Sequence, residues 1–258
     1  MRPSTWDGSG PLLPKHPRAM RMYAHPRMHP TSSHERRGWP RGYVAALASV
    51  FVNDRHAGEF VVRDLSAGGA LLVNGPLLPA KTDCTLLLRV PGLGPLRLNA
   101  QTVHTAAVGN DRYAVGVRFT RLAPAVAEGL RDLVEQELER ALQPSVLVAD
   151  HDLARLSDLA EDLADLGERP LLALTPLEVV HWLCDPETTV ELALLSEELY
   201  EKSGSGVFDF VRAEFPQVRA VLLKDTLGRE ELRELLEWAA GPARSARQLK
   251  ASQGYDAV

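Results

Sequence analysis

Two short stretches of the sequence carry side chains that could hold an anionic ligand. In one, Asp64 and Ser66 stand two residues apart, directly before a pair of glycines. In the other, Arg37 and Arg41 stand four residues apart, with Arg36 beside the first. Guanidinium groups donate forked hydrogen bonds to anionic oxygens, while a carboxylate and a hydroxyl add acceptors and a donor. The two stretches together indicate a ligand that is anionic and rich in hydrogen-bonding groups.

The composition bounds the classes of protein to consider. The chain has 258 residues, of which 45% are hydrophobic, which is enough for two domains with separate cores. Its net charge is -5, with basic residues concentrated near the start and acidic residues from Glu128 onward. A chain of this charge without a basic recognition helix is not expected to bind nucleic acid.

The cysteines and the hydropathy indicate where the protein works. Cys84 and Cys184 lie far apart in apolar segments, so we expect two buried free thiols and no disulfide. No stretch approaches the roughly 18 consecutive apolar residues of a membrane span, and no signal peptide is evident. The sequence therefore predicts a cytoplasmic protein without membrane insertion.

The chain begins with a segment that differs from the rest. Residues 1–34 are rich in proline, glycine and serine and show no periodicity, so we expect a disordered tail. Its histidines have no helix to align them on a metal, and no metal site is predicted. Further methionines in this segment leave the translation start open.

A first domain, residues 35–143, is predicted to be an all-β barrel or sandwich followed by a helix. Short β-prone runs alternate with turn residues, which is typical of antiparallel folds. The helix is expected over Pro124–Leu142, where apolar residues from Val126 to Leu142 fall on one stripe. The expected strands are Tyr43–Val52, Glu59–Arg63, Ala70–Val73, Cys84–Val90, Leu96–His104 and Tyr113–Phe119.

A second domain is predicted over residues 144–241. Apolar strands alternate there with amphipathic helices, which indicates a parallel sheet covered on both faces. Residues 242–258 lose this periodicity, and we expect them to form a flexible tail.

Residues 35 to about 122 resemble the PilZ domain, a small β-barrel whose signature is RxxxR followed by [D/N]xSxxG. Both halves are present, as Arg37-xxx-Arg41 and Asp64-x-Ser66-xx-Gly69, and Val115–Phe119 is similar to the closing strand of the family. The resemblance implies a receptor for the bacterial second messenger cyclic di-GMP.

The resemblance also implies a role for each motif residue. Cyclic di-GMP has two phosphodiesters and two guanines. Arginines suit its phosphates and the guanine O6 and N7 atoms, and a carboxylate suits guanine N1 and N2. Glycine lets backbone approach the ligand. The implied ligand site consists of Arg36, Arg37, Arg41, Asp64, Ser66 and Gly69.

Other interpretations of these residues stay open at this point. The arginines could belong to a solvated basic segment, and Asp64 with Ser66 could form a self-capped turn. Trp39 could stack on a base or pack against the barrel. Arg118 is kept as a candidate contact at the rim.

Residues 145 to about 240 are similar in pattern to the receiver domain of response regulators, which implies a flavodoxin-like α/β fold. Asp150 matches the first acidic position of that family, and is followed by His151 and Asp152. Ser196 stands where the phosphorylated aspartate is expected, and a serine cannot form an acyl phosphate. The resemblance therefore implies a pseudo-receiver.

The remaining receiver positions also depart from the family. Lys224 or Asp225 stands where a small hydroxyl residue is expected, Thr226 comes slightly late, and no fifth strand with a lysine follows. We interpret Asp150 to Asp152 as a helix N-cap, and Glu197 with Glu198 as a surface acidic cluster.

These observations predict a non-enzymatic signalling adaptor with no catalytic residues and no cofactor besides its ligand. The barrel would bind cyclic di-GMP, and the pseudo-receiver would bind an unidentified protein partner or form a homodimer. The alternatives are an interaction module that does not bind nucleotide, and an atypical response regulator.

Overall fold

The computed structural model describes residues 40–109, 111–202, 206–223 and 227–239. The predicted tails 1–34 and 242–258 lie outside these residues. So do Arg36, Arg37 and Trp39 of the first motif, and residues 224–226.

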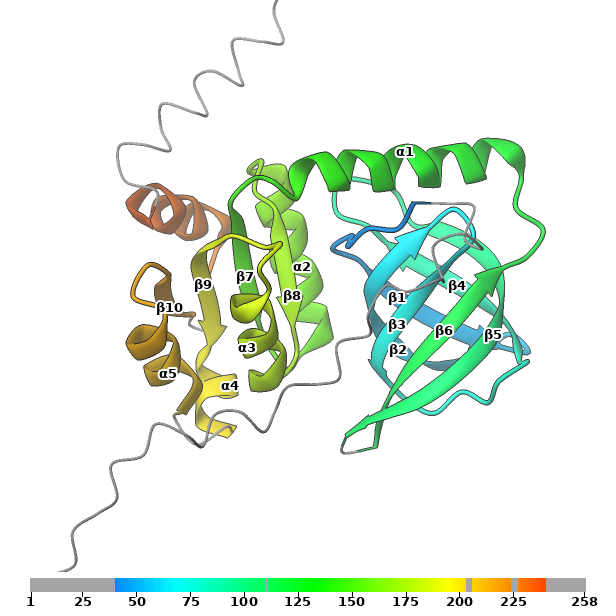
Figure 1. Cartoon of the computed structure of the whole chain (residues 1–258), viewed down its shortest axis with the longest axis horizontal. Helices are drawn as coiled ribbons and strands as arrows, with labels where there is room; N and C mark the ends of the chain where they lie inside the picture. The colour runs from blue at the N-terminus through cyan, green and yellow to red at the C-terminus, as the bar shows by residue number, and fades with distance from the viewer. Residues whose placement is uncertain (1–39, 110, 203–205, 224–226, 240–258) are drawn as a thin grey trace, which may run out of the picture. The chain divides into compact units, whose positions relative to one another are not determined.

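Six antiparallel strands form a closed barrel in the order β1-β2-β3-β6-β5-β4 (Figure 1). The predicted all-β class is confirmed, and the barrel is the correct one of the two expected architectures. Alternate residues fill the barrel, as in β4, where Leu86 and Leu88 are fully buried between half-buried or exposed neighbours. The strands are β1 (Leu47–Val52), β2 (Arg55–Ser66), β3 (Gly69–Gly75), β4 (Asp83–Arg89), β5 (Leu96–Gly109) and β6 (Arg112–Phe119).

Strand β2 is longer than predicted and changes the setting of the second motif. Asp64 and Ser66 belong to the strand, so the turn to β3 is confined to Ala67 and Gly68. The ladder to β3 has a bulge between Val62 and Asp64. Because a bulge adds one residue to one strand, Arg63 and Asp64 both lie on the outer side of the barrel.

Helix α1 (Pro124–Arg140) packs against the barrel core. Pro124 opens its first turn as predicted, and Leu130 and Val134 are buried in the barrel's apolar cluster. The predicted apolar stripe is not buried at its C-terminal end, because Leu138 is 41% and Leu142 is 91% exposed. Leu142 follows the end of the helix and therefore does not share its buried face.

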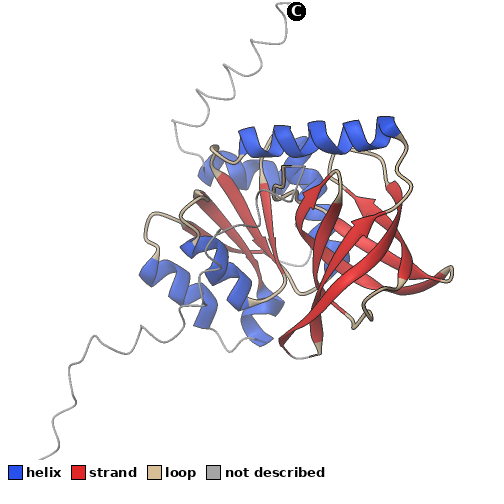
Figure 2. Ribbon diagram, turned by 45° about the vertical axis from the view of Figure 1, so that its right-hand side comes forward, coloured by secondary structure: helices blue, strands red, loops and turns tan. Residues whose placement is uncertain are grey.

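The described residues after α1 form the predicted parallel sheet, with four strands in the order β10-β9-β7-β8. Helix α2 and the helix of residues 229–239 bury side chains on one face, and α3, α4 and α5 bury theirs on the other (Figure 2). The strands are β7 (Ser145–Ala149), β8 (Pro170–Ala173), β9 (Val190–Ser196) and β10 (Arg219–Leu223). The named helices are α2 (Leu153–Asp165), α3 (Pro176–Cys184), α4 (Glu197–Lys202) and α5 (Gly206–Glu214).

The barrel and the parallel sheet fall within one compact unit of residues 39–258. Ala45, Leu47 and Val61 of the barrel belong to the same apolar cluster as Val146 and Leu156 of the second region. The predicted division at residue 144 coincides with the connection from α1 to β7, and as a domain boundary it stays a prediction.

The two cysteines differ in exposure. Cys84 is buried on β4, and this burial raises the pKa of its thiol to about 11. Cys184 is exposed, so the prediction of a second buried thiol is wrong. It is the last residue of α3, off the face that buries Val179 and Trp182. None of the described helices is long and apolar enough to cross a membrane.

Candidate functional site

The two halves of the arginine and aspartate motif meet at one end of the barrel. A guanidinium nitrogen of Arg41 donates to Oδ1 of Asp64 over 3.0 Å. The side chains of Arg41 and Asp64 are 36% and 31% exposed, so the ion pair faces solvent. Of the predicted arginines, Arg41 alone is among the described residues, and it lies beside Asp64.

Arg41 is held in place by its neighbour in the chain. Gly42 and Leu65 form an antiparallel bridge, in which Gly42 N donates to Leu65 O over 3.1 Å and Leu65 N donates to Gly42 O over 2.9 Å. A Cβ on Gly42 would come within 3.3 Å of Leu138 on α1. The segment after Arg41 therefore runs between β2 and α1, which fixes Arg41 next to Asp64.

Ser66 builds the turn between β2 and β3. It is 2% exposed, its hydroxyl donates to the carbonyl oxygen of Gly69 over 3.0 Å, and Gly68 N donates to that hydroxyl over 3.3 Å. The self-capped turn considered from the sequence thus describes Ser66. It does not describe Asp64, which lies in the strand and pairs with Arg41.

Gly69 permits a close approach between two strands. A Cβ at this position would lie 2.1 Å from the carbonyl oxygen of Val117 on β6, well inside van der Waals contact. Gly69 is paired with Arg118 in the ladder. Arg118 is exposed and donates to Gln101 over 3.2 Å, so it lies at the rim beside the motif turn.

Two residues that flank the motif make contacts that the sequence analysis missed. Tyr43 accepts a hydrogen bond from Leu172 N of β8 over 2.9 Å, and its ring stands edge-on to Trp182 of α3 at 4.7 Å between centroids. The guanidinium of Arg63, the residue at the bulge, lies 4.2 Å from the centre of the Trp182 ring. Burial raises the pKa of Tyr43 and lowers the pKa of Arg63. No local sequence pattern indicates these contacts, because their partners lie on β8 and α3, far away in the sequence.

A second charged cluster lies where β7 and β9 end. Asp150 is 2% exposed and accepts hydrogen bonds from Asp152 N over 2.8 Å and from Arg155 over 3.2 Å. Arg155 also contacts Glu198 over 2.9 Å, and His151 lies 3.0 Å from the same carboxylate. Within the described part of the chain, no cluster of His, Cys, Asp and Glu is arranged to hold a metal.

The predicted N-cap is confirmed for one residue of this cluster. Asp152 caps α2 by accepting from Ala154 N over 2.8 Å and Arg155 N over 3.4 Å. Asp150 serves instead as the buried partner of Arg155. Ser196, at the end of β9, is buried and accepts from Leu199 N over 3.1 Å. Glu198 does not belong to a purely acidic surface cluster, because it pairs with Arg155.

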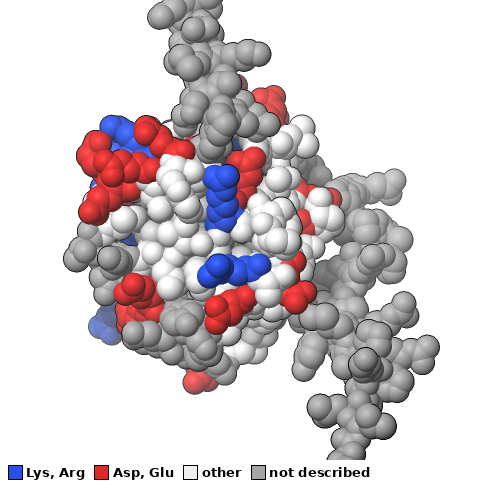
Figure 3. Space-filling view, turned by 90° about the vertical axis from the view of Figure 1, so that its left-hand side faces the viewer, with Lys and Arg blue, Asp and Glu red and all other residues white. Residues whose placement is uncertain are grey.

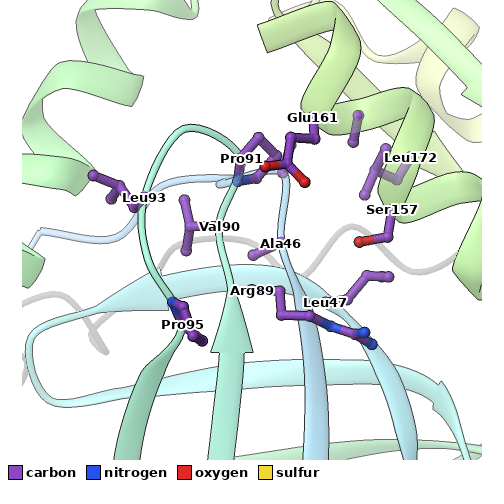
Figure 4. A pocket seen from close by; sticks show the side chains of 12 residues that line it. Ala46, Leu47, Arg89, Val90, Pro91, Leu93, Pro95, Ser157, Glu161 and Leu172 are labelled. Carbon is purple, nitrogen blue, oxygen red and sulfur yellow. The ribbon is translucent and has the colours of Figure 1, made fainter. Parts of the chain in front are cut away.

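A pocket of about 190 Å³ lies between the start of β1, the β4–β5 connection and α2 (Figure 4). Arg89, Ser157 and Glu161 contribute its polar groups. Pockets that bury drug-sized ligands typically have about 300–1,000 Å³. This pocket is therefore too small to be the site of a dinucleotide.

Residues 35–136 match the family model of the PilZ domain. This segment, which contains the barrel and most of α1, is therefore a PilZ domain. The match covers less than half of the chain and leaves the parallel sheet unassigned. No curated protein sequence matches the chain.

Several solved structures are similar to part of the chain. The complex of Escherichia coli YcgR with c-di-GMP is 21% identical, covering 41% of this chain and 46% of that one, with a TM-score of 0.36. The isolated PilZ domain of Escherichia coli YcgR with c-di-GMP is 18% identical over 41% and 94%, with a TM-score of 0.35. Apo MrkH from K. pneumonia is 13% identical over 40% and 49%, with a TM-score of 0.35. The chain spans less than half the length of the first of these proteins.

Proposed function

We propose that this protein is a cyclic di-GMP-binding signalling adaptor, with its ligand site at the barrel rim and a receiver-like second domain. The observation that carries the proposal is the 3.0 Å contact between Arg41 and Asp64, which joins the two motif halves on the surface of a PilZ domain. The PilZ signature supplies the ligand class.

In this proposal each charged motif residue meets a specific part of the ligand. Arg36, Arg37 and Arg41 bind the phosphates and the O6 and N7 edge of guanine. Asp64 accepts hydrogen bonds from guanine N1 and N2. Ser66 acts through the turn that it builds, because its hydroxyl is already bonded to Gly69.

The ligand must displace or share the ion pair between Arg41 and Asp64. Exposed ion pairs contribute about 0–1 kcal/mol, so opening this one costs little against the binding of a dianionic nucleotide. Gly69 acts by holding β3 close to β6, which sets the position of the turn. The backbone of the site is thus preorganised, while its charged side chains can rearrange.

The same motif is connected to the second domain through two residues. Tyr43, two positions after Arg41, bonds to Leu172 of β8, and Arg63, directly before Asp64, stacks on Trp182 of α3. In our proposal, a ligand that moves Arg41 and Asp64 also biases these contacts. Nucleotide binding would thereby change the surface that the second domain presents to a partner.

The second domain supports a receiver-like assignment without phosphorylation chemistry. Numbered along the chain, its strands lie in the order 2-1-3-4, which is four of the five strands of the flavodoxin-like order. Ser196 occupies the position of the phosphoaccepting aspartate. The Arg155 guanidinium lies 3.2 Å from Asp150, and its positive charge disfavours a divalent cation on that carboxylate. An atypical response regulator is therefore the weaker candidate.

Titration calorimetry of the full-length protein with cyclic di-GMP tests the ligand. We expect saturable heat from the wild type and none from the Arg37→Ala, Arg41→Ala double variant. The matched control is Arg89→Ala, which removes a barrel arginine that pairs with Glu59 at the same 3.0 Å distance but outside the motif. Absence of heat from the wild type would overturn the proposal.

Hydrogen exchange tests the connection to the second domain. Saturation with cyclic di-GMP should change the protection of amides in β8 and α3, with Leu172 the most direct reporter. If binding occurs and these amides are unchanged, the ligand assignment stands and the coupling is wrong.

One observation favours a second candidate, an interaction module without nucleotide binding. Asp64 and Ser66 are both already hydrogen-bonded within the chain. The calorimetric titration separates this candidate from the first, because only a receptor gives saturable heat.

A further inference from the structure

Strand β10 forms an outer edge of the parallel sheet. Among the described residues it pairs with β9 alone, in parallel register from Arg219 to Leu223. The three residues in its middle, 220–222, are only half-buried. An edge strand presents unpaired backbone N–H and C=O groups, which can pair with another strand.

The opposite edge of the same sheet is protected. All four residues of β8 are buried, the strand begins with Pro170, and the amide of Leu172 donates to the hydroxyl of Tyr43. β10 has no comparable protection within the described residues. It contains no proline, its register with β9 has no bulge, and its single charge is Arg219 at one end.

A further parallel strand after β10 would break a strong topological preference. The step from β9 to β10 passes through α5, which packs on the face that also buries α3. A further parallel strand beyond β10 would need its helix on that same face, because about 98% of such connections are right-handed. The helix of residues 229–239 packs on the other face, where Leu232 and Leu236 join the cluster of α2.

That helix is fixed where it lies. Arg229 contacts Asp165 over 3.0 Å, and Arg219 of β10 donates to the carbonyl oxygen of Trp238 over 3.1 Å. A parallel strand that followed it at the edge of β10 would make a left-handed connection. Among the described residues this edge therefore has no partner, which leaves it open to a strand from another chain.

The surroundings of β10 favour burial against a protein. Trp238, whose backbone is bonded to Arg219, has 67% of its surface exposed. Figure 3 shows the side of the molecule that carries β10, α5 and the helix of residues 229–239, with a broad uncharged area crossed by basic side chains and bordered by acidic ones. Exposed tryptophan beside an uncharged area is typical of protein interfaces.

We propose that β10 is a homodimer contact, in which a second copy adds its own β10 in antiparallel orientation about a twofold axis. Such an interface must be complementary to itself. The antiparallel arrangement places the two Arg219 side chains at opposite ends and brings the apolar residues 220–223 of both copies together. Four strands from each copy then form one continuous sheet. This dimer does not depend on nucleotide binding.

Sedimentation of the full-length chain without nucleotide, over a range of concentrations, tests the proposal. We expect a dimer of the 28.3 kDa chain. Trp238→Lys and Ala220→Lys should each raise its dissociation constant by about tenfold or more, because a lysine at the edge or its flank opposes pairing. The control is Leu177→Lys, which places the same charge on a 69% exposed apolar residue of α3 and should leave the dimer unchanged.

The outcomes divide clearly. A monomer at all concentrations overturns the proposal, as does a dimer that neither edge variant weakens or that Leu177→Lys weakens equally. Circular dichroism of each variant shows whether it is folded. If Ala220→Lys is not folded, the dissociation constant of Trp238→Lys alone tests the proposal. Hydrogen exchange should show amides of β10 that become more protected as the dimer forms.

Discussion

The barrel rim and the end of the parallel sheet each bring an arginine to an aspartate, but in different surroundings. At the rim, Arg41 and Asp64 lie 3.0 Å apart with side chains 36% and 31% exposed. In the sheet, Arg155 and Asp150 lie 3.2 Å apart with side chains 28% and 3% exposed. The difference is the burial of the carboxylate.

Burial changes what the same pair of groups can do. An ion pair near solvent contributes little to stability, so either of its groups can turn to a ligand instead. Removing the partner of a buried carboxylate strongly destabilises the folded protein. We therefore interpret the rim pair as part of a binding site and the sheet pair as part of the structure. Motif matching alone does not separate these cases, because both carry plausible functional residues.

Gly69→Ala should have the largest effect, since the backbone of the rim is rigid even though its ion pair is not. The new Cβ would lie 2.1 Å from the carbonyl oxygen of Val117, and we expect a loss of about 3 kcal/mol in the free energy of unfolding. Urea denaturation measures it. The control is Gly129→Ala in α1, where no atom lies within 4 Å and a gain of about 0.5–1 kcal/mol is expected.

Arg155→Leu tests the structural role of the buried pair. Removing Arg155 leaves Asp150 without its guanidinium, and we expect a loss of about 2 kcal/mol, below the value for a fully buried pair because Arg155 is 28% exposed. The same urea series applies. The double variant with Asp150→Asn should recover part of the loss. A loss as small as that of a surface substitution would mean that burial does not distinguish the two clusters.

Tyr43→Phe tests the contact between the two regions. The substitution removes the hydroxyl that accepts from Leu172 N and leaves a buried N–H group, at a cost of about 1–2 kcal/mol. Thermal unfolding should show a lower midpoint, together with faster hydrogen exchange at Leu172. Tyr113→Phe on β6 serves as the control. Unchanged exchange at Leu172 would show that this hydrogen bond does not hold the regions together.

Arg41→Ala should have the smallest effect on stability and a large effect on ligand binding. We expect less than about 1 kcal/mol of lost stability, because the pair with Asp64 faces solvent. Arg89→Ala removes a second exposed ion pair and should lose a similar amount of stability in urea denaturation. In calorimetry it should still bind cyclic di-GMP, unlike Arg41→Ala. A large loss of stability for Arg41→Ala alone would mark the rim pair as structural and weaken the comparison.

The regular elements could be predicted because they follow from local patterns. Alternation in Leu96 to Gln101 and the short β-prone runs predicted an antiparallel barrel or sandwich, and apolar strands between amphipathic helices predicted the parallel sheet. The meeting of Arg41 with Asp64 followed from the motif resemblance, and their role as a site stays a prediction.

Features that depend on packing between distant elements were missed. The sequence left two roles open for Ser66, a ligand contact and a self-capped turn, and only the packing of β2 against β3 shows that the turn uses its hydroxyl. Cys184 was expected to be buried, but the buried face of α3 is set by Val179 and Trp182. Tyr43 finds its partner in Leu172, 129 positions away, and no local pattern could indicate that contact.

The bulge in β2 has a consequence for how such sequences align. A chain lacking residue 63 would still turn Val62 and Leu65 inward and keep Asp64 on the outer side, since the ladder already treats that residue as extra. What the insertion adds is Arg63 on the ring of Trp182. Among related barrels, we expect a gap at this position where no second domain lies against β2, and an arginine or another flat cation where one does.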